Sequence, residues 1–520
     1  MGPASLPASA GSVRDARGTP ALALRALNGG AGRQSEPEAL ARSASAGTEA
    51  RPIGAGTRRG LLVLGLLLLA PPVLAGAPEV RERLEQLVSS LPKRTQVGLL
   101  VRDDASGEHW FEQSPDLPLQ PASVQKLFVT AVALERYGPE FTFDTPLLVS
   151  GDEAWVVGGG DPAFGDDRIA ERYGREPLAV FDEWAAALKA AGLTTIARIV
   201  LDDTLFDQQV RHPDWDPQQV LRWYEAPIGA LVVCTNCVTV RVLLNGKSVA
   251  LNSLPPLPPE LLHNAVVRGR RHHVVLTRKP GQDAFEVSGT ATRSADVGDA
   301  TADRPTPFFA QVLKRALADR GVALTGAIVR RAIRADERSR ARQVAIHRTP
   351  LRDILWRCNS HSQNLFAECL VKSLVARDAQ GRPTGTPGTW SAGTAALLDS
   401  VRRLGVDVRG MTLRDASGLS HNNRATARQF VTLLQIMHAR PNGPVFANSM
   451  AEPGEEGTLR DYTAPALHGR MRGKTGTIQD VHALAGYVTR ADGHTLEFAL
   501  LVNGTAPDHF RQDIAAALVR

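Results

Sequence analysis

Cysteine is scarce in this sequence, with four residues in 520. Two cysteine pairs are too few to hold a chain of this length together as a disulfide scaffold. Cys234 and Cys237 have the spacing of a redox motif, but the strand-like residues 238–242 follow where such a motif would begin a helix. A zinc site would need two further ligands nearby, and the neighbouring sequence offers none. We therefore expect buried thiols or one structural disulfide.

The sequence also lacks a hydrophobic run long enough to cross a bilayer comfortably. An apolar run at residues 60–74 is only about three-quarters of the usual ~20-residue span, and it contains two adjacent prolines. Arg58 and Arg59 precede the run and small residues around Ala75 follow it, which is the layout of a secretory signal peptide. We interpret residues 1–75 as a leader and signal peptide and expect a periplasmic or extracellular protein. The alternative is an uncleaved N-terminal anchor, and we expect membrane contact only in that case.

A large excess of charge of one sign is missing as well. The sequence has 60 basic and 54 acidic residues, a net charge of +6, and residues 1–75 contain 8 of the basic and 4 of the acidic ones. The rest of the chain therefore carries only about +2, which gives no overall footprint for a nucleic-acid partner. With 43% hydrophobic and 22% charged residues, the composition is that of a globular protein and excludes collagen-like or wholly disordered chains.

Lysine is the rare basic residue, since 8 of the 60 basic residues are lysines and the rest are arginines. A desolvated lysine can lose its proton at working pH, whereas an arginine effectively cannot. Each lysine is therefore a candidate for a specific chemical role.

Strand pairs at both ends of the chain, each beside a terminal helix, predict one antiparallel sheet built from both termini. The middle of the chain, residues 141–345, is then an insertion. It contains short β-like runs and two amphipathic segments, around residues 181–191 and 308–320, so we expect it to form compact structure. Helical patterning returns after about residue 350.

Ser123 and Lys126 form the first candidate for chemistry. They lie at the start of a predicted helix over residues 123–137, and the i, i+3 spacing places both side chains on one helix face. A neutral lysine amine could then take the proton of the serine hydroxyl. The structural alternative is a helix-capping serine and a surface lysine. A second pair with the same spacing, Ser90 and Lys93, contains Pro92, which breaks the helical turn.

Lys474, Thr475 and Gly476 form the second candidate, on a predicted strand before the C-terminal hairpin. The lysine supplies a cation for a substrate carboxylate, the threonine supplies a hydroxyl, and the glycine would let a ligand approach the backbone. The alternative is a charged edge strand.

Ser362 and Asn364 form the third candidate, at the beginning of a predicted helix. Ser362 can relay a proton and Asn364 can orient Lys126 and a substrate amide. The alternative is a pair of polar capping residues. Ser420 and Asn422 repeat the pattern in a glycine-rich loop and are the weaker choice.

Together, in the order S-x-x-K, S-x-N and K-T-G, these motifs are the signature of penicillin-binding proteins and serine β-lactamases. Lys126 and Ser362 are 236 positions apart, farther than a β-lactamase allows. Across residues 79–520 the chain resembles the class C low-molecular-mass penicillin-binding proteins, a family of D-alanyl-D-alanine carboxypeptidases and endopeptidases. Residues 158–162, 415–420 and 473–477 also match this family.

The resemblance implies an α+β fold. A penicillin-binding-protein or serine β-lactamase-like catalytic domain, an antiparallel sheet with helices, is interrupted by two smaller and mostly β inserted domains. We expect the catalytic domain at residues 79–140 and 346–520. Inserted domain II would cover residues 141–225 and 291–345, and inserted domain III residues 226–290.

The resemblance further implies a serine DD-peptidase that hydrolyses D-Ala-D-Ala bonds of peptidoglycan without a metal or cofactor, with the cross-link bonds as further candidate substrates. Ser123 would attack the carbonyl, Lys126 would take its proton, and Ser362 would pass a proton to the leaving nitrogen. Stem peptides of peptidoglycan and β-lactam antibiotics are the expected partners. The alternatives are a β-lactamase or esterase on the same fold, or a catalytically dead protein that binds the cell wall.

The substrate-binding residues also follow from the resemblance. Asn364 would hold the substrate amide, and Lys474 with Thr475 the terminal carboxylate. The backbone N–H groups of Ser123 and Thr477 would form the oxyanion hole. Ser420 lies in a loop where this chain has a histidine in place of the family's arginine.

An acidic residue of the second domain holds the side-chain amine of the substrate in some relatives. Asp214 or Asp216, which flank Trp215, could serve here, and we choose Asp216 together with Ser420 for this side of the site.

Overall fold

We describe a computed structural model that covers residues 77–520. The predicted leader and signal peptide, residues 1–75, lies outside the described residues. Within them, no helix combines the length and the apolar character needed to cross a bilayer.

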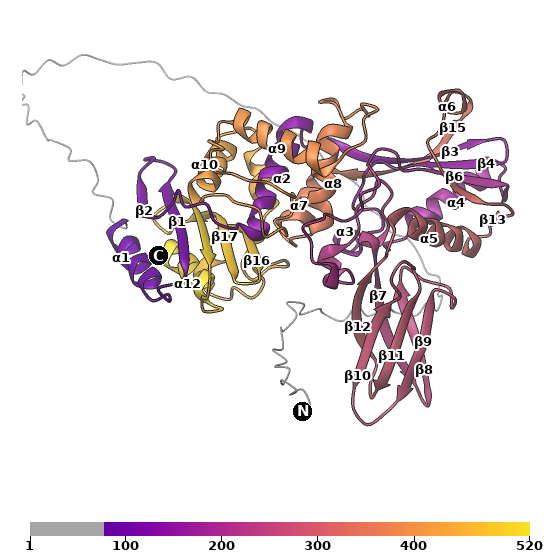
Figure 1. The fold of residues 1–520 in the computed structure, drawn as a ribbon, viewed down its shortest axis with the longest axis horizontal. Helices are drawn as coiled ribbons and strands as arrows, with labels where there is room; N and C mark the ends of the chain where they lie inside the picture. The colour runs from indigo at the N-terminus through magenta and orange to yellow at the C-terminus, as the bar shows by residue number, and fades with distance from the viewer. Residues whose placement is uncertain (1–76) are drawn as a thin grey trace, which may run out of the picture. The chain divides into compact units, whose positions relative to one another are not determined.

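The two ends of the chain build one five-stranded antiparallel sheet, as predicted, with the order β16-β17-β18-β1-β2 (Figure 1). The central strand β18 pairs with β1 from the other end of the chain, and Val101 lies opposite Phe498. The strands are β1 (Gln96–Asp103), β2 (His109–Gln113), β16 (Met471–Ile478), β17 (Val481–Thr489) and β18 (Thr495–Asn503), and the terminal helices α1 (Ala77–Ser89) and α12 (Phe510–Val519) contact each other.

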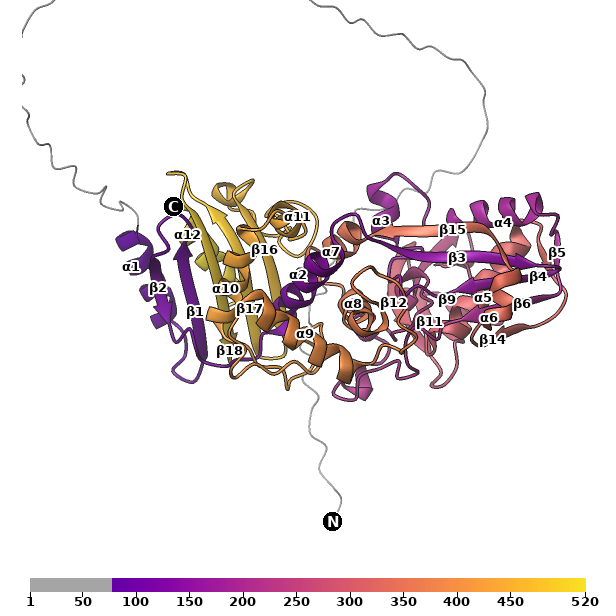
Figure 2. The same cartoon turned by 90° about the horizontal axis from the view of Figure 1, so that it is seen from above.

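A group of helices packs on the sheet and between the sheet and the insertion. The most buried is α8 (Asn364–Ala376), in which only Val375 is not buried, because its apolar residues surround the helix on all sides. Helices α2 and α7 both contact α8, and Figure 2 shows the three together. The other members are α2 (Lys126–Tyr137), α7 (Leu351–Asn359), α9 (Trp390–Leu404), α10 (Ala427–His438) and α11 (Gly443–Asn448).

The insertion leaves and rejoins this body on two paired strands, β3 (Thr142–Ser150) and β15 (Arg342–Pro350). They belong to a five-stranded mixed sheet with the order β14-β6-β4-β3-β15. Both predicted helices of the insertion are present, as α4 (Val180–Ala190) and α5 (Pro305–Asp319). The remaining elements are α3 (Asp167–Arg172), β4 (Glu153–Val157), β5 (Thr195–Ile196), β6 (Arg198–Asp202), β13 (Ala323–Leu324), β14 (Ile328–Arg330) and α6 (Ala335–Arg340).

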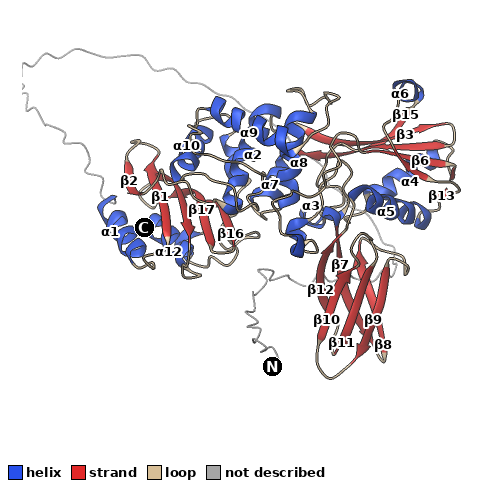
Figure 3. Ribbon diagram, in the orientation of Figure 1, coloured by secondary structure: helices blue, strands red, loops and turns tan. Residues whose placement is uncertain are grey.

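Six further strands form two three-stranded sheets, β12-β7-β8 and β10-β11-β9 (Figure 3). We call residues 237–301 the β unit. One apolar cluster continues from it into the sheet of β3, β4 and β6. The strands are β7 (Cys237–Asn245), β8 (Ser248–Leu254), β9 (Leu262–Arg268), β10 (His273–Arg278), β11 (Phe285–Ala291) and β12 (Ala295–Thr301).

Strand β12 differs from the sequence-based expectation. We assigned residues 291–345 to inserted domain II, but β12 pairs with β7, so the chain returns from the β unit only after Thr301. The sequence hides this strand because Val297 is its only large apolar residue. The division into domains as a whole stays a prediction.

All four cysteines are buried. Cys237 begins strand β7, as the sequence indicated, so the C-x-x-C pair does not open an α-helix. Within residues 77–520, no group of three or more His, Cys, Asp or Glu side chains is arranged to hold a metal ion.

Candidate active site

Ser123 lies on a single 3-10 turn, residues Ala122–Gln125. We expected it in the first turn of a regular α-helix. Helix α2 begins only at Lys126. Ala122 has a left-handed backbone conformation with φ of 45°, which is unfavourable for a residue with a Cβ atom. Such local strain is typical of functional sites. The turn leaves Ser123 half-buried, whereas Lys126 is fully buried.

Two glycines allow the surrounding chain to approach this turn closely. A Cβ atom on Gly418 would lie 1.9 Å from the carbonyl oxygen of Ala122, and one on Gly476 would lie 2.8 Å from the carbonyl oxygen of Pro121. We expected Gly476 to make room for a ligand. Its missing side chain instead makes room for the turn that carries Ser123.

Lys126 donates to three oxygen atoms. Its Nζ lies 2.8 Å from Ser123 Oγ, 2.7 Å from Asn364 Oδ1 and 2.8 Å from the carbonyl oxygen of Ser417. Burial lowers the pKa of Lys126 to about 8, against the opposing effect of the Glu368 and Asp415 carboxylates. In a substantial fraction of the protein molecules, Lys126 is therefore a neutral amine near pH 8.

The neutral form of Lys126 fits these contacts well. A neutral amine has two N–H bonds and one lone pair. The oxygen atoms of Asn364 and Ser417 can only accept, so they take the two N–H bonds. The lone pair is then left for the hydroxyl proton of Ser123. The orientation of the Asn364 amide is fixed by its other end, because Nδ2 donates to the carbonyl oxygen of Tyr224 at 2.8 Å.

Asn364 therefore connects the insertion to Lys126. Tyr224 belongs to a short 3-10 turn, Trp223–Glu225, which contacts helix α8. Sequence reasoning assigned no role in the site to this turn. Because the contact is made by a backbone carbonyl, the identity of the side chain at position 224 carries no signal for it.

Ser362 and Lys474 come together on the other side of the site. The Nζ of Lys474 donates to Ser362 Oγ at 2.8 Å and to the carbonyl oxygen of Thr475 at 2.7 Å. Ser362 lies between α7 and α8 with φ of 60°, a second left-handed residue at the site. Burial holds the pKa of Lys474 well below its usual value, and the neighbouring cation Lys126 lowers it further.

Strand β16 presents the K-T-G motif at the edge of the sheet. Gly473 exchanges both of its backbone hydrogen bonds with Ala451, away from β17. Backbone groups alternate in direction along a strand, so those of Thr475 and Thr477 face the same outer side.

Arg511, from helix α12, donates to Gly476 O at 3.0 Å and to Thr477 Oγ1 at 2.9 Å. Sequence reasoning missed Arg511, because this contact joins residues 34 positions apart.

Two buried carboxylates, also missed, support the site. Glu368 lies four residues after Asn364 and accepts from Trp390 Nε1 at 2.7 Å and from the backbone N–H of Ser417 at 2.7 Å. Asp415 accepts from Trp215 Nε1 at 3.0 Å, among other donors. The two carboxyl groups accept hydrogen bonds from several N–H donors, which suits carboxylates that can only accept. Burial and the charge of Asp415 raise the pKa of Glu368 to about 7.

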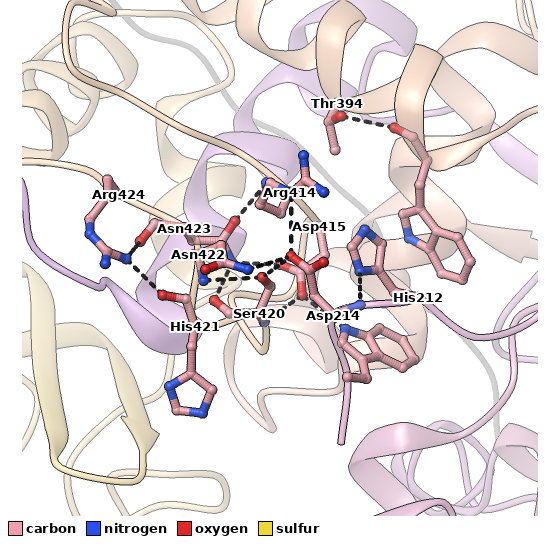
Figure 4. A network of polar contacts seen from close by, with 12 residues as sticks. His212, Asp214, Thr394, Arg414, Asp415, Ser420, His421, Asn422, Asn423 and Arg424 are labelled. Carbon is pink, nitrogen blue, oxygen red and sulfur yellow. Dashed lines mark hydrogen bonds and ion pairs between the residues drawn. The ribbon is translucent and has the colours of Figure 1, made fainter. Parts of the chain in front are cut away.

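Asp214, and not Asp216, contacts the loop of Ser420 (Figure 4). Its Oδ2 accepts from Ser420 Oγ at 2.7 Å, from Asn422 Nδ2 at 3.1 Å and from Arg414 Nε at 3.2 Å. Partial burial opposes ionisation, but these hydrogen bonds outweigh it and lower the pKa of Asp214 to about 2.

Asp216 is exposed and accepts from the backbone N–H of Gln218 at 2.9 Å, as the cap of a short 3-10 turn. The structure thus does not bring our predicted Asp216 together with Ser420. The two positions differ by only two residues in an irregular segment, where no periodicity tells which side chain turns toward the site.

Residues 80–520 match the model of the D-Ala-D-Ala carboxypeptidase 3 (S13) family. The chain belongs to this family. It is 29% identical to the D-alanyl-D-alanine carboxypeptidase of Actinomadura sp. (strain R39), with 91% of this chain and 90% of that protein covered. It is 24% identical to carboxypeptidase DacB of Mycolicibacterium smegmatis, with 84% of each chain covered.

Among solved structures, the chain is similar to penicillin-binding protein 4 (dacB) of Haemophilus influenzae. The TM-score is 0.67 at 20% identity, with 84% of this chain and 98% of that chain covered. The predicted family and the α+β fold with a penicillin-binding-protein-like catalytic domain are therefore confirmed. The predicted enzyme class, a serine-type D-Ala-D-Ala carboxypeptidase, is confirmed by membership of the S13 family.

Proposed function

We propose that Ser123 is the nucleophile of this peptidase and that Lys126 is its general base. The observation that carries the proposal is the set of contacts around Lys126. Two obligate acceptors occupy the N–H bonds of its neutral amine, and its lone pair faces Ser123 Oγ at 2.8 Å. Attack on the carbonyl carbon of the penultimate D-Ala forms the Ser123 ester while Lys126 takes the hydroxyl proton.

The remaining residues have complementary roles in the proposal. Ser362, in contact with Lys474, relays the proton that Lys126 has taken from Ser123 to the leaving nitrogen of D-Ala, so that Ser362 keeps its hydroxyl and Lys126 is neutral again before deacylation. The oxyanion of the tetrahedral intermediate accepts from the backbone N–H groups of Ser123 and Thr477, the latter on the outer edge of β16. Each such donor contributes about 10²–10³ in rate. Water then hydrolyses the acyl-enzyme, and no step needs a metal or cofactor.

The substrate is held at both of its ends. Lys474 and Thr475 bind the terminal carboxylate, and Asn364 holds the substrate amide. Asp214, replacing Asp216 in our assignment, binds a side-chain amine of the stem peptide together with Ser420. Oδ2 of Asp214 has three donors, whereas Oδ1 has none among the described residues and can accept from a substrate ammonium group.

The substrates are stem peptides of peptidoglycan, with cross-link bonds cut as a second activity, and β-lactams acylate Ser123. The apolar segment at residues 60–74 directs export to the periplasm or the outside of the cell. Incubation of the purified enzyme with cross-linked muropeptides and mass analysis of the products tests the activity. Loss of one terminal D-Ala identifies the carboxypeptidase, and separation of dimers identifies the endopeptidase.

Labelling with a fluorescent penicillin separates this proposal from the alternatives. A stable label on Ser123 together with product formation supports the peptidase. Rapid loss of the label would identify a β-lactamase instead. No label and no product would identify a cell-wall binding protein without activity.

A further inference from the structure

Three turns of the β unit meet at one end of its two sheets. They are residues 245–248, 269–272 and 292–294. Arg268 donates to the carbonyl oxygen of Gly246, which joins the first turn to the second. The backbone N–H of Leu244, just before the first turn, donates to Ser294 Oγ of the third turn at 2.9 Å. We call these turns, with the flanking residues Arg268 and His273, the β-unit tip.

The β-unit tip is basic and contains no acidic residue. Its cationic side chains are all exposed, and none has an ion-pair partner in the part of the chain that the structure describes. The acidic residue that follows the third turn, Asp296, lies 3.6 Å from Arg241 and is thereby already paired. The tip residues are Lys247, Arg268, Arg270, Arg271 and Arg293, together with His272 and His273.

Two exposed valines lie on the outer face of the sheet beside the β-unit tip. Val267 is 59% exposed and Val275 is 39% exposed, and large hydrophobic side chains with this exposure are rare within residues 77–520. Val267 pairs with Thr290, which in turn lies opposite His273 in the same sheet. The apolar side chains therefore adjoin the cationic turns directly.

The β-unit tip points away from the catalytic body. The opposite end of the unit, where Thr301 pairs with Cys237, adjoins the segment that leads to the active site, since Thr301 Oγ1 donates to the carbonyl oxygen of Val220. At the tip end, Ala295 pairs with Val242. Changes at the tip should therefore leave acylation of Ser123 intact.

We propose that the β-unit tip binds the surface of an anionic lipid bilayer and so holds the enzyme beside a membrane. Clustered arginines bind headgroup phosphates, and each basic residue close to an anionic bilayer contributes roughly a fivefold gain in binding. The valines enter the shallow apolar layer beneath the headgroups. A soluble polyanion would satisfy the arginines but would leave Val267 and Val275 in water.

Sedimentation of the exported protein with vesicles tests the proposal. One set contains phosphatidylcholine alone, and the other contains about one-third phosphatidylglycerol. We expect binding only to the anionic set, with weakening as salt rises. Reversing three charges, R270E/R271E/R293E, should reduce that binding by about 10²-fold or more. Fluorescent penicillin labelling should stay at the wild-type level.

A matched variant controls for the change in net charge. R81E/R94E/R338E reverses three exposed arginines that also have no ion-pair partner within residues 77–520. It should bind vesicles more than tenfold better than the tip variant. Equal loss in the two variants would overturn the proposal, as would equal binding of the wild type to both vesicle sets.

A second variant, V267S/V275S, separates the bilayer from a soluble polyanion. It should weaken vesicle binding several-fold and leave binding to soluble polyphosphate unchanged. If the valine variant bound vesicles like the wild type while polyphosphate bound the tip with equal strength, the partner would be a soluble polyanion and the bilayer proposal would be wrong. If a triple variant lost penicillin labelling through misfolding, the single change R270A replaces it, and unchanged vesicle binding then counts against the proposal.

Discussion

Glu368 accepts a 2.7 Å hydrogen bond from the backbone N–H of Ser417, whose carbonyl oxygen accepts from Lys126 at 2.8 Å. The buried carboxylate thus positions one of the two acceptors that orient the base. Its negative charge also favours the protonated form of Lys126 and opposes the effect of burial on the lysine pKa. Glu368 does not touch the reacting atoms, so it is a positioning residue with an electrostatic effect.

The change E368Q removes this charge and keeps the size of the side chain. The pKa of Lys126 should fall, because a nearby anion that stabilises the ammonium form is lost. The acid limb of the acylation profile should therefore move to lower pH, even if the maximal rate drops several-fold. The β-lactam acylation rate against pH measures this. E368A should lower the maximal rate further, and an unmoved acid limb in E368Q would leave Glu368 with a structural role alone.

The change S123A should abolish penicillin labelling and peptidase activity, with a loss of at least about 10⁴-fold and an unchanged melting temperature. S90A is the matched control, because Ser90 also precedes a lysine by three positions. Its exposed hydroxyl donates to the carbonyl oxygen of Leu87 at 2.6 Å and contacts no lysine among the described residues. Labelling that survived S123A and disappeared in S90A would contradict the assignment of the nucleophile.

Acylation by the wild type should rise as the pH increases through about 8. Below this pH Lys126 is mostly protonated and has no lone pair for the proton of Ser123, and above it the neutral amine predominates. The change K126R should be nearly as damaging as K126A, since arginine stays charged across this range. Single-turnover acylation between pH 6 and 10 checks both expectations. Substantial acylation by K126R would show that position 126 needs only a cation.

The change G418A should lower the stability of the folded protein and slow acylation. Gly418 has φ of 81°, and its added Cβ would lie 1.9 Å from the carbonyl oxygen of Ala122, so the nucleophile turn must move. Gly493 is the control, with φ of 90° and no atom within 4 Å of an added Cβ. G493A should cost about 1 kcal/mol through backbone strain alone. Thermal melts and acylation rates for the two variants separate the strain from the clash.

The sequence predicted the parts of the site that are local. Ser123 with Lys126 and Ser362 with Asn364 are recognisable because the two members of each pair are only two or three positions apart in the sequence. The sheet from both termini was predictable from strand-like runs with turn residues between them. Glu368 and Arg511 were not predictable, because their partners lie 49 and 34 positions away and depend on how helices pack. The choice between Asp214 and Asp216 was wrong for a different reason. Their segment is irregular, so no repeating pattern tells which of the two side chains faces Ser420.

The last prediction concerns Lys474 and the terminal carboxylate of the substrate. We expected a permanent cation, but burial and Lys126 lower the pKa of Lys474, so binding of a carboxylate should also favour its protonation. The wild type should hydrolyse an acylated D-Ala-D-Ala peptide about 10–100-fold better, in kcat/KM, than the same peptide with a C-terminal amide. K474A should lose most of this preference, and K474R should keep part of it, because arginine also binds carboxylates but with altered geometry. Equal preference in the wild type and K474A would place the carboxylate elsewhere, and Lys474 would then act only on Ser362, with which it makes its 2.8 Å contact.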